Sequence, residues 1–267
     1  MDKEPLISII TPNYNCATYI AQTIESVIAQ TYQNWEMLIQ DDCSTDGSLE
    51  IAQSYAQKDS RIKVESNKSN VGAANSRNNA IRRSQGTYLS FLDSDDLWIP
   101  TKLEEQIRFM QTNNCDFCYA RYEHINKKGE SMLIQAKAIK HLTYNRLLFH
   151  CWTGCLTVIY KQDLSDKIYG PVLKNCNDHG LFLKVMPQIK NAMGMDKCLG
   201  LYRIREGGIS RKKTGKLSSF YKLFHDHEGI NYLLATFFLI TQILVKKFYK
   251  YRKITIEESC TQYLNQI

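Results

Sequence analysis

Along the first hundred residues, short apolar runs alternate with longer segments in which apolar residues recur at helical spacing. A short apolar run between turn residues is typical of a buried strand, and a repeat of three or four residues is typical of an amphipathic helix. Strands that alternate with helices imply parallel pairing in an open α/β sheet. The pattern predicts strands at residues 6–10, 37–39, 62–64 and 88–92, and helices starting at Tyr19 with Thr18 as the cap, around Ile51 to Tyr55, and at 73–83.

The second half of the chain is less regular. After Pro100 a helix is expected, with Leu103, Ile107 and Met110 on one face. Residues 117–160 indicate short strands and loops, and a helix at 178–185 and a strand at 199–204 close the compact part of the chain. We therefore expect one α/β domain over residues 1–210, followed by a helical tail over residues 211–267.

Polar side chains follow the apolar residues of the predicted strands. Thr11 and Asn13 come after the first strand, Asp42 after the second, and residues 93–96 after the fourth. In an open α/β sheet, ligands bind beyond the carboxyl ends of the strands. The fold would therefore bring these residues to one crevice, although they are far apart in the sequence.

The segment Leu92-Asp93-Ser94-Asp95-Asp96 places three carboxylates within four residues. Such groups repel one another unless a positive charge lies among them. Mg²⁺ and Mn²⁺ are typically held by one or two carboxylates while diphosphate oxygens and waters complete the coordination. The position after a strand favours a metal and diphosphate site over the alternative, a solvated acidic loop in which Asp95 or Asp96 caps the next helix.

Two further residues each allow a binding role and a structural role. Asp42 can accept a hydrogen bond from a base or a ribose, or it can cap the next helix together with Ser44. Arg77 lies one or two turns into a helix whose N-terminus can face a phosphate, or it is a solvated surface residue.

A general base for a transfer to a hydroxyl group is expected near the start of the helix at residues 178–185. Asp178 in Cys176-Asn177-Asp178-His179-Gly180 is the best candidate. An aspartate at a helix start is often a cap, and His179 is the alternative base. The other five histidines show no spacing typical of a metal site.

Composition and charge exclude some classes of protein. With 267 residues, 43% hydrophobic and 23% charged, the chain can bury a full core. The net charge is +7, and basic residues are concentrated in two runs, at residues 211–216 and 246–253. These runs indicate a polyanionic partner. No helix-turn-helix, finger or aromatic RNA-binding signature is present, so nucleic acid is not expected to be that partner.

The nine cysteines raise the possibilities of a zinc site and of disulfides, because of the spacings Cys115-x-x-Cys118 and Cys151-x-x-x-Cys155. The segment around Cys118 alternates like a strand, which would send the first two thiols in different directions. The N-terminus shows no secretory signal, so the chain is expected in a reducing cytoplasm. We therefore expect neither a structural zinc ion nor a disulfide framework.

Four segments in a fixed order carry a resemblance that no single one of them would. They are residues 8–15, 40–48, 70–78 and 86–96, with the sequences SIITPNYN, QDDCSTDGS, NVGAANSRN and GTYLSFLDSDD. As a set they resemble the family 2 of inverting glycosyltransferases, which has the Rossmann-like GT-A fold with a mostly parallel sheet. Leu199-Gly200-Leu201-Tyr202-Arg203 and Gly207-Gly208-Ile209-Ser210 resemble the family's segment after the base, so the resemblance covers about residues 5–210.

The resemblance implies roles for the matching residues. Residues 1–98 would form the half that binds the nucleotide sugar, and residues 99–210 the half that binds the acceptor. Asp178 matches the aspartate of the family's Glu-Asp pair, the catalytic base, but Asn177 precedes it instead of Glu, and Cys43 replaces the usual Gly after the paired acids. Pro12, Tyr14, Asp42 (on uracil), Arg77, Asp93 and Asp95 would bind the nucleotide sugar, and Asp95 and Asp96 would hold Mn²⁺ or Mg²⁺.

The resemblance also implies a reaction. A base would take the proton of the acceptor hydroxyl, and this oxygen would displace the nucleoside diphosphate in line, so a UDP-α-sugar would give a β-linkage. Relatives of this size build O-antigen or capsule repeat units in lipopolysaccharide and polysaccharide biosynthesis. We expect transfer of galactose or glucose from the UDP-sugar to GlcNAc- or GalNAc-diphospho-undecaprenol with a β-1,3 linkage.

Alternative functions remain from the sequence alone. One is a glycosyltransferase that acts on a later lipid-linked oligosaccharide or on the lipopolysaccharide core. Another class is a non-catalytic module that binds a nucleotide sugar. A nucleotidyltransferase would need a glycine-rich, basic phosphate loop after the first strand, where this chain has Thr11-Pro12-Asn13-Tyr14.

The tail combines an apolar segment with a basic cluster. Residues 230–245 are apolar but contain Asn231, Thr236, Thr241 and Gln242, and they fall short of the ~20 apolar residues that a spanning helix needs. Residues 246–253 follow with five basic residues interleaved with aromatic ones. This pattern favours docking on an anionic membrane, at the inner face of the cell membrane, and the alternative is a helix packed on the domain or on another subunit.

Overall fold

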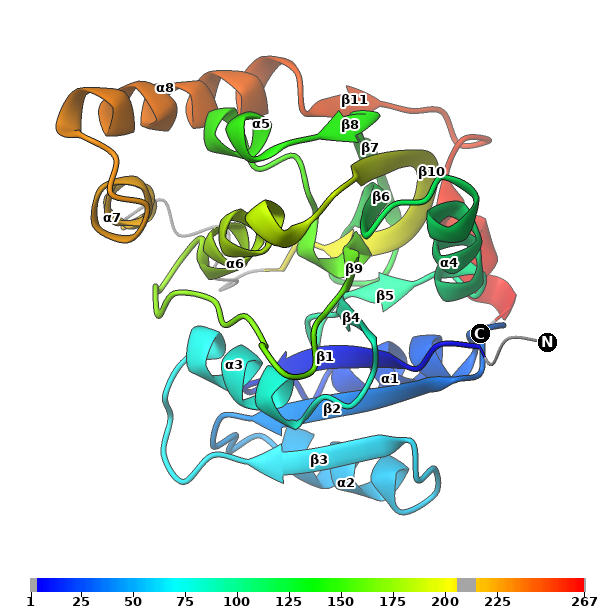
Figure 1. Ribbon diagram of the computed structural model, residues 1–267. Helices are drawn as coiled ribbons and strands as arrows, with labels where there is room; N and C mark the ends of the chain where they lie inside the picture. Colours follow the sequence, from blue (N-terminus) through cyan, green and yellow to red (C-terminus); the bar gives the residue numbers. More distant parts are fainter. Residues whose placement is uncertain (1–3, 206–214, 267) are drawn as a thin grey trace.

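Four strands of the first hundred residues pair in parallel, as the alternation of strands and helices predicts. The computed structural model describes residues 4–205 and 215–266, and its strands follow the order β4-β1-β2-β3 in this part of the sheet (Figure 1). The elements are β1 (Ile7–Asn13), α1 (Ile20–Ile28), β2 (Trp35–Asp41), α2 (Ser48–Ala56), β3 (Ile62–Ser66), α3 (Ala73–Arg83) and β4 (Tyr88–Phe91).

The helices of this half cover both faces of the sheet because the strands are apolar on both sides. Side chains of a strand point to alternate faces, so neighbouring residues of β1 enter different clusters. Ile7 and Ile9 pack in one cluster with Ile24 of α1, and Ile10 packs in the other with Ile81 of α3. Near-continuous apolar runs of this kind are typical of parallel strands that are buried on both faces.

The predicted cap of the first helix is wrong. Tyr19, and not Thr18, is the N-cap of α1, and its side chain makes no capping hydrogen bond. Instead, the backbone N–H groups of Tyr19 and Ile20 both donate to the carbonyl oxygen of Cys16 at 2.9 Å. A turn that precedes the helix therefore uses a backbone acceptor in place of a side chain.

The second half extends the same sheet with mainly antiparallel strands. β9 pairs antiparallel with β4, and β6 pairs antiparallel with β9 and β7 and parallel with β10. The longest pairings of the sheet are parallel, as predicted. The elements are β5 (Leu97–Trp98), α4 (Lys102–Thr112), β6 (Phe117–Ile125), β7 (Ser131–Ala136), β8 (His141–Leu142), α5 (Tyr144–Phe149), β9 (Ile159–Lys161), α6 (Asn177–Val185) and β10 (Ala192–Arg203).

The C-terminal segment packs on the domain. β11 (Tyr251–Lys253) follows α7 (Lys216–Lys222) and α8 (Tyr232–Phe248), and it pairs antiparallel with β7 at the sheet edge. Part of the predicted tail therefore packs on the domain. Most of the basic run at residues 211–216 and the segment Gly207-Gly208-Ile209-Ser210 lie outside the described residues. Among the described helices, none combines the length and the apolar character that crossing a membrane requires.

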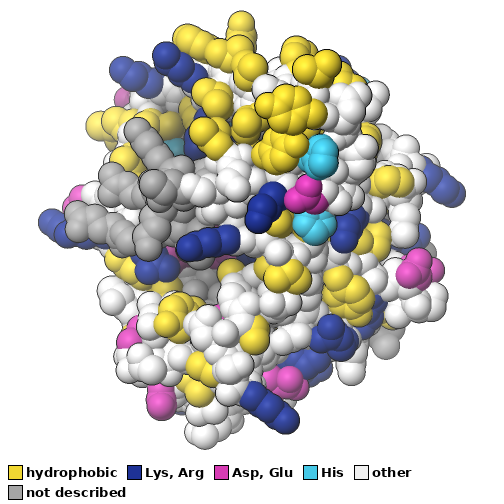
Figure 2. Space-filling model, turned by 90° about the vertical axis from the view of Figure 1, so that its left-hand side faces the viewer, with side chains coloured by type: hydrophobic (Ala, Val, Ile, Leu, Met, Phe, Trp, Pro, Cys, Tyr) yellow, Lys and Arg dark blue, Asp and Glu magenta, His cyan; other side chains and the backbone are white. Residues whose placement is uncertain are grey.

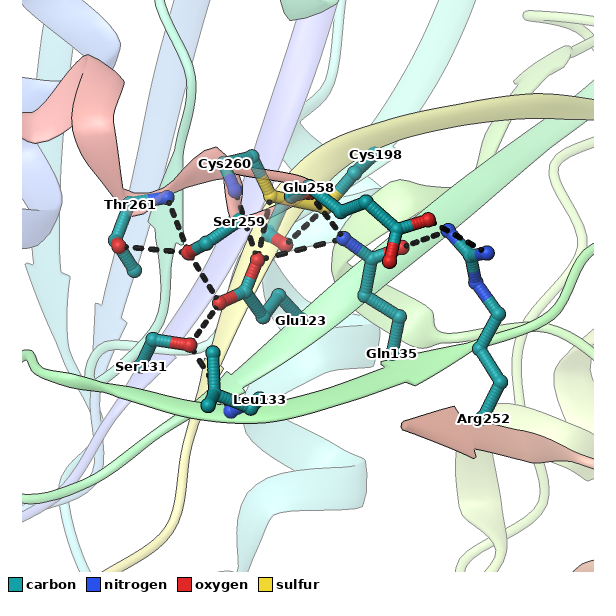
Figure 3. The surroundings of a disulfide bond; sticks show 11 residues. Glu123, Ser131, Leu133, Gln135, Cys198, Arg252, Glu258, Ser259, Cys260 and Thr261 are labelled. Atoms are coloured by element: carbon teal, nitrogen blue, oxygen red, sulfur yellow. Dashed lines mark hydrogen bonds and ion pairs between the residues drawn. A yellow bond between two sulfur atoms is a disulfide. The ribbon is translucent and has the colours of Figure 1, made fainter. Parts of the chain in front are cut away.

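A disulfide also joins the C-terminal segment to the domain, and the expectation of unpaired cysteines is wrong here. Cys198 of β10 is bonded to Cys260, which lies 62 residues further along the chain (Figure 3). The sequence could not show this pair because only the tertiary fold brings the C-terminal segment to β10. Cys115, Cys118, Cys151 and Cys155, whose spacings suggested a zinc site, are free thiols.

The buried carboxylate of Glu123 lies beside this disulfide and binds the C-terminal segment. It accepts hydrogen bonds from the Ser259 hydroxyl at 2.7 Å, from the Cys260 N–H at 2.8 Å and from the Ser131 hydroxyl (Figure 3). Glu123 itself is fully buried, although it belongs to β6. A charged group is tolerated in the core only when it is paired or hydrogen-bonded in this way.

We expect Glu123→Ala to lower the free energy of unfolding by about 3 kcal/mol, because the donors from Ser131, Ser259 and Cys260 would lose their acceptor. Urea unfolding followed by circular dichroism would measure the change. Glu130→Ala is the matched control, because Glu130 is exposed and its side chain accepts only from Asn126, and it is expected to cost less than about 0.5 kcal/mol. Equal unfolding midpoints for the two variants would contradict the structural role of Glu123.

Candidate active site

The acidic loop after β4 is held by the end of β10. Asp96 is 2% exposed, and its carboxylate accepts the backbone N–H of Arg203 at 2.8 Å. The Arg203 side chain donates to the carbonyl oxygen of Asp95 at 2.8 Å and lies over the ring of Tyr19. Arg205 forms an ion pair with the Asp95 carboxylate. The loop is therefore a supported structure and not the free acidic turn that the sequence left as an alternative.

Negative charge is concentrated at this loop. Burial raises the pKa of Asp96 well above its usual range, and the charges of Asp95 and Asp93 add to the effect, whereas Arg203 opposes it. Burial likewise raises the pKa of Asp93, whereas the charge of Arg77 opposes the shift and the charges of Asp95 and Asp178 add to it. A cation placed among these carboxylates would relieve both effects.

Arg77 bridges the two halves of the chain. It is 6% exposed, and its guanidinium donates to Asp93 at 2.8 Å and to the side-chain oxygen of Asn177. Arg77 is therefore not a solvated surface residue. Asp93 follows β4 and Asn177 begins α6, and the bond from Arg77 to Asn177 joins residues that are a hundred positions apart.

Asp178 lies at the same place, in the first turn of α6. It is close enough to Arg77 and Asp93 to interact electrostatically with both. Within residues 4–205 and 215–266, no hydrogen bond to its carboxylate is found. A half-buried carboxylate without an internal donor is available to accept a proton from a bound molecule.

His179, the alternative base, points the other way. Its side chain is buried, its Nε2 contacts the carbonyl oxygen of Leu147 at 2.8 Å, and its ring packs against Phe220 and Phe224. Burial lowers the pKa of His179 to about 4. The position of the ring therefore suits a core residue and leaves Asp178 as the candidate base.

Asp42 is engaged in local structure. Its carboxylate accepts the backbone N–H groups of Val71 and Gly72, both at 2.8 Å, and the side-chain amide of Asn67 at 2.9 Å. It fixes the loop before α3 against the end of β2, so neither Asp42 nor Ser44 caps α2. Contacts with a base would use the remaining acceptor capacity of the same oxygens.

Residues at the end of β1 lie next to the end of β2. Asn13 is buried and donates to Asp41 at 2.8 Å, whereas Tyr14 is 50% exposed and Pro12 is partly buried. Cys43 adopts φ 62°, the left-handed conformation that glycine would supply at this turn. Pro12 and Tyr14 thus lie at the end of β1, Asp42 at the end of β2 and the acidic loop after β4, and Arg77 and Asp178 lie near Asp93.

Sequence reasoning missed Arg205 and gave Arg203 no role. Both belong to the segment Tyr202-Arg203-Ile204-Arg205, where alternate residues of an extended chain point the same way. That spacing was the available signal. Their contact with the acidic loop depends on the pairing of β10 with β5 and β6, which the sequence does not show.

The profile of the family described as "Glycosyl transferase family 2" matches residues 8–161. The chain belongs to this family. The chain superimposes on the crystal structure of S. aureus TarS 1-349 in complex with UDP-GlcNAc, with a TM-score of 0.69 and 26% identity over 82% of this chain and 64% of the TarS chain, and its fold is the GT-A fold. The protein is therefore a GT-A glycosyltransferase.

Two curated relatives match nearly the full length. TuaG of Bacillus subtilis, whose name assigns it to teichuronic acid biosynthesis, is 37% identical over 87% of this chain and 92% of its own. WfgD of Escherichia coli, named as a UDP-Glc:α-D-GlcNAc-diphosphoundecaprenol β-1,3-glucosyltransferase, is 36% identical over 90% of this chain and 93% of its own. These relatives belong to bacterial polysaccharide synthesis.

Proposed function

We propose that this glycosyltransferase moves glucose or galactose from the UDP-sugar to GlcNAc- or GalNAc-diphospho-undecaprenol, with inversion and a β-1,3 linkage. The observation that carries the proposal is the bridge by Arg77, which joins the acidic loop after β4 to the start of α6, where Asp178 lies. The name of WfgD, which is similar over most of the chain, supports this donor and acceptor. The repeat unit would belong to an O-antigen or a related polysaccharide.

Asp178 is the base of the proposed reaction. It takes the proton of the acceptor hydroxyl, and this oxygen attacks the anomeric carbon while the bond to the diphosphate breaks on the opposite face. Arg77 holds Asp93 and Asn177, and so fixes the start of α6 relative to the donor side. Tyr14 and Pro12 would line the nucleotide pocket. Asp42 would hold the loop before α3 in place beside the uracil of the donor.

The acidic loop fits a divalent cation. Asp95 and Asp96 supply hard oxygen donors, and Asp93 adds a third carboxylate to the same loop. Asp95 and Asp96 would hold Mn²⁺ or Mg²⁺, with Asp93 as support. When bound, the ion supplies charge neutralisation for the departing diphosphate.

The test is a panel of UDP-sugars with GlcNAc- and GalNAc-diphospho-lipid acceptors, assayed with Mn²⁺ and with a chelator. We expect one hexose to be transferred with a β-1,3 linkage, and chelation to lower the rate by at least about 100-fold. Asp95→Asn is expected to behave like chelation. Asp196→Asn, at an exposed aspartate paired with Arg121, is the matched control and should transfer at the wild-type rate.

Two results would contradict the proposal. Transfer that is undiminished by chelation would show that the reaction does not need the metal. A failure to use any lipid diphosphate acceptor would show that the proposed acceptor class is wrong.

We also include peripheral contact with the inner face of the cell membrane in the proposal, since an undecaprenol-linked acceptor lies in the bilayer.

A further inference from the structure

Helix α8 presents a continuous apolar face to solvent. Leu233, Phe237, Ile240, Leu244 and Phe248 follow one another at intervals of three or four residues and are 79%, 47%, 49%, 47% and 61% exposed. Residues at such intervals lie on one side of a helix. Tyr232, Leu234, Ile243 and Tyr249 widen the face and are exposed as well. Contiguous exposed apolar patches mark interaction sites.

The opposite side of α8 is fixed to the domain. Ala235 and Gln242 are buried, and Phe238 packs against Phe224 and Phe149. The exposure of the apolar face is therefore not the result of a detached helix. In Figure 1, α8 lies at the opposite end of the molecule from β3 and α2, and Figure 2 shows hydrophobic side chains gathered at this end.

The charged residues beside this face favour an anionic partner. Lys246 and Lys247 are exposed in the last turn of α8, and Lys253 is exposed in β11. Asp226 and Glu228 lie before the helix, but the Glu228 carboxylate accepts the Tyr144 hydroxyl at 2.6 Å. An apolar face with lysines at its end suits a bilayer with anionic headgroups, where aromatic and aliphatic side chains enter the interface and lysines meet phosphates.

Helix α8 also contacts the segment that leads to the candidate base. The Gln242 amide donates to the carbonyl oxygen of Leu148 and accepts the N–H of Cys151, both at 3.0 Å. Thr241 donates to the carbonyl oxygen of Phe149 at 2.7 Å, and Lys250 donates to that of Cys151 at 2.7 Å. These contacts fix residues 148–151 on the inner side of α8.

This segment reaches the site within a few residues. Cys151 lies near enough to Asp178 for the carboxylate to affect its thiol, whose pKa burial raises to about 11. Cys155, four residues on, interacts electrostatically with Arg77, Asp93 and Asp178. The same segment is joined to α6, because His179, the residue after Asp178, contacts the carbonyl oxygen of Leu147 at 2.8 Å.

We propose that α8 lies in the interface of an anionic bilayer with its apolar face in the lipid, and that its contacts with residues 148–151 set the position of Asp178 relative to the membrane. The second part rests on the proposed function, because it assumes that Asp178 acts on a lipid-linked acceptor. Docking would then place the headgroup of the acceptor at a fixed distance from the base.

The first part is tested by sedimentation with vesicles of equal parts phosphatidylglycerol and phosphatidylethanolamine, without donor or acceptor. Phe237→Ser/Ile240→Ser/Leu244→Ser is expected to lower the affinity by about 100-fold. Met132→Ser/Leu164→Ser/Ile256→Ser changes three exposed apolar residues elsewhere and should bind like the wild type. Lys246→Gln/Lys247→Gln should weaken binding about tenfold or more.

Other results would overturn docking. The wild type should bind pure phosphatidylcholine vesicles more weakly than the anionic vesicles, and equal binding would show that charge plays no part in docking. A dimer in sedimentation velocity without lipid, abolished by the triple α8 variant but not by the control variant, would assign the face to a second copy of the chain.

The second part is tested with Gln242→Leu. This variant should bind vesicles like the wild type but transfer sugar to the membrane-embedded acceptor at least about tenfold more slowly. The triple α8 variant should keep its rate on a water-soluble acceptor with a short alkyl chain. Normal transfer by Gln242→Leu would overturn the coupling, whereas absence of transfer by every protein on every acceptor would count against the proposed function and leave vesicle binding as a separate result.

Discussion

Asp178→Asn is expected to lower kcat by about 1000-fold, because the amide cannot take the proton of the acceptor hydroxyl. The change keeps the size of the side chain at the start of α6, so the Kd for UDP should stay within about twofold of the wild-type value. Initial rates with saturating donor and acceptor would measure kcat, and calorimetric titration would measure the Kd.

Asp166→Asn is the matched control for this substitution. Asp166 is exposed in the loop before α6, and its conversion to asparagine should leave both kcat and the Kd for UDP unchanged. If Asp178→Asn retained more than about a tenth of the wild-type kcat, another group would have to be the base. His179 would not be that group, since its ring lies in the core against Phe220 and Phe224.

Arg77→Met should lower kcat/KM for the UDP-sugar by at least about 100-fold. Arg77 is the buried cation between Asp93 and Asp178, and its loss would leave two carboxylates without a countercharge and separate the acidic loop from α6. Arg77→Lys keeps the charge but not the planar fork that reaches two oxygens at once, so it should give an intermediate value. Steady-state kinetics at several donor concentrations would measure both.

The control for Arg77 lies on the same helix. Arg82 is exposed and its guanidinium bonds to Asn79, so Arg82→Met should leave kcat/KM unchanged. Because Arg77→Met could also lower stability, circular dichroism at the assay temperature must show a folded protein. A folded Arg77→Met variant with wild-type kcat/KM would contradict the bridging role.

The local sequence pattern was sufficient to predict a helix whose apolar residues recur on one side. The helix predicted at residues 73–83 has the bounds of α3, because Ala80 and Ile81 define its buried side and Gly72 precedes it. β6 was not recognised as a strand of nine residues, because Arg121, Glu123 and His124 interrupt its apolar character. The C-terminal segment, far along the chain, supplies two of the donors that the buried Glu123 carboxylate requires.

The same distinction holds at the site. The carboxylates Asp42, Asp93, Asp95, Asp96 and Asp178 could be selected from the sequence, since each sits at the end of a strand or the start of a helix. The residues that bind these carboxylates could not be selected in this way. Arg205 reaches Asp95 only because β10 pairs with β5 and β6, and a register of this kind depends on tertiary packing rather than on local pattern.

The support of Asp96 by the Arg203 amide also orders the events of synthesis. β1 to β4 are joined by short connections within the first hundred residues, so this part of the sheet can assemble while later residues are still on the ribosome. Arg203 leaves the ribosome about a hundred residues after Asp96. A nascent chain that ends at β9 would contain Asp42 and the loop before α3 that it holds. It would lack the Arg203 amide that orients Asp96, so the acidic loop would gain this support only once β10 pairs with β6.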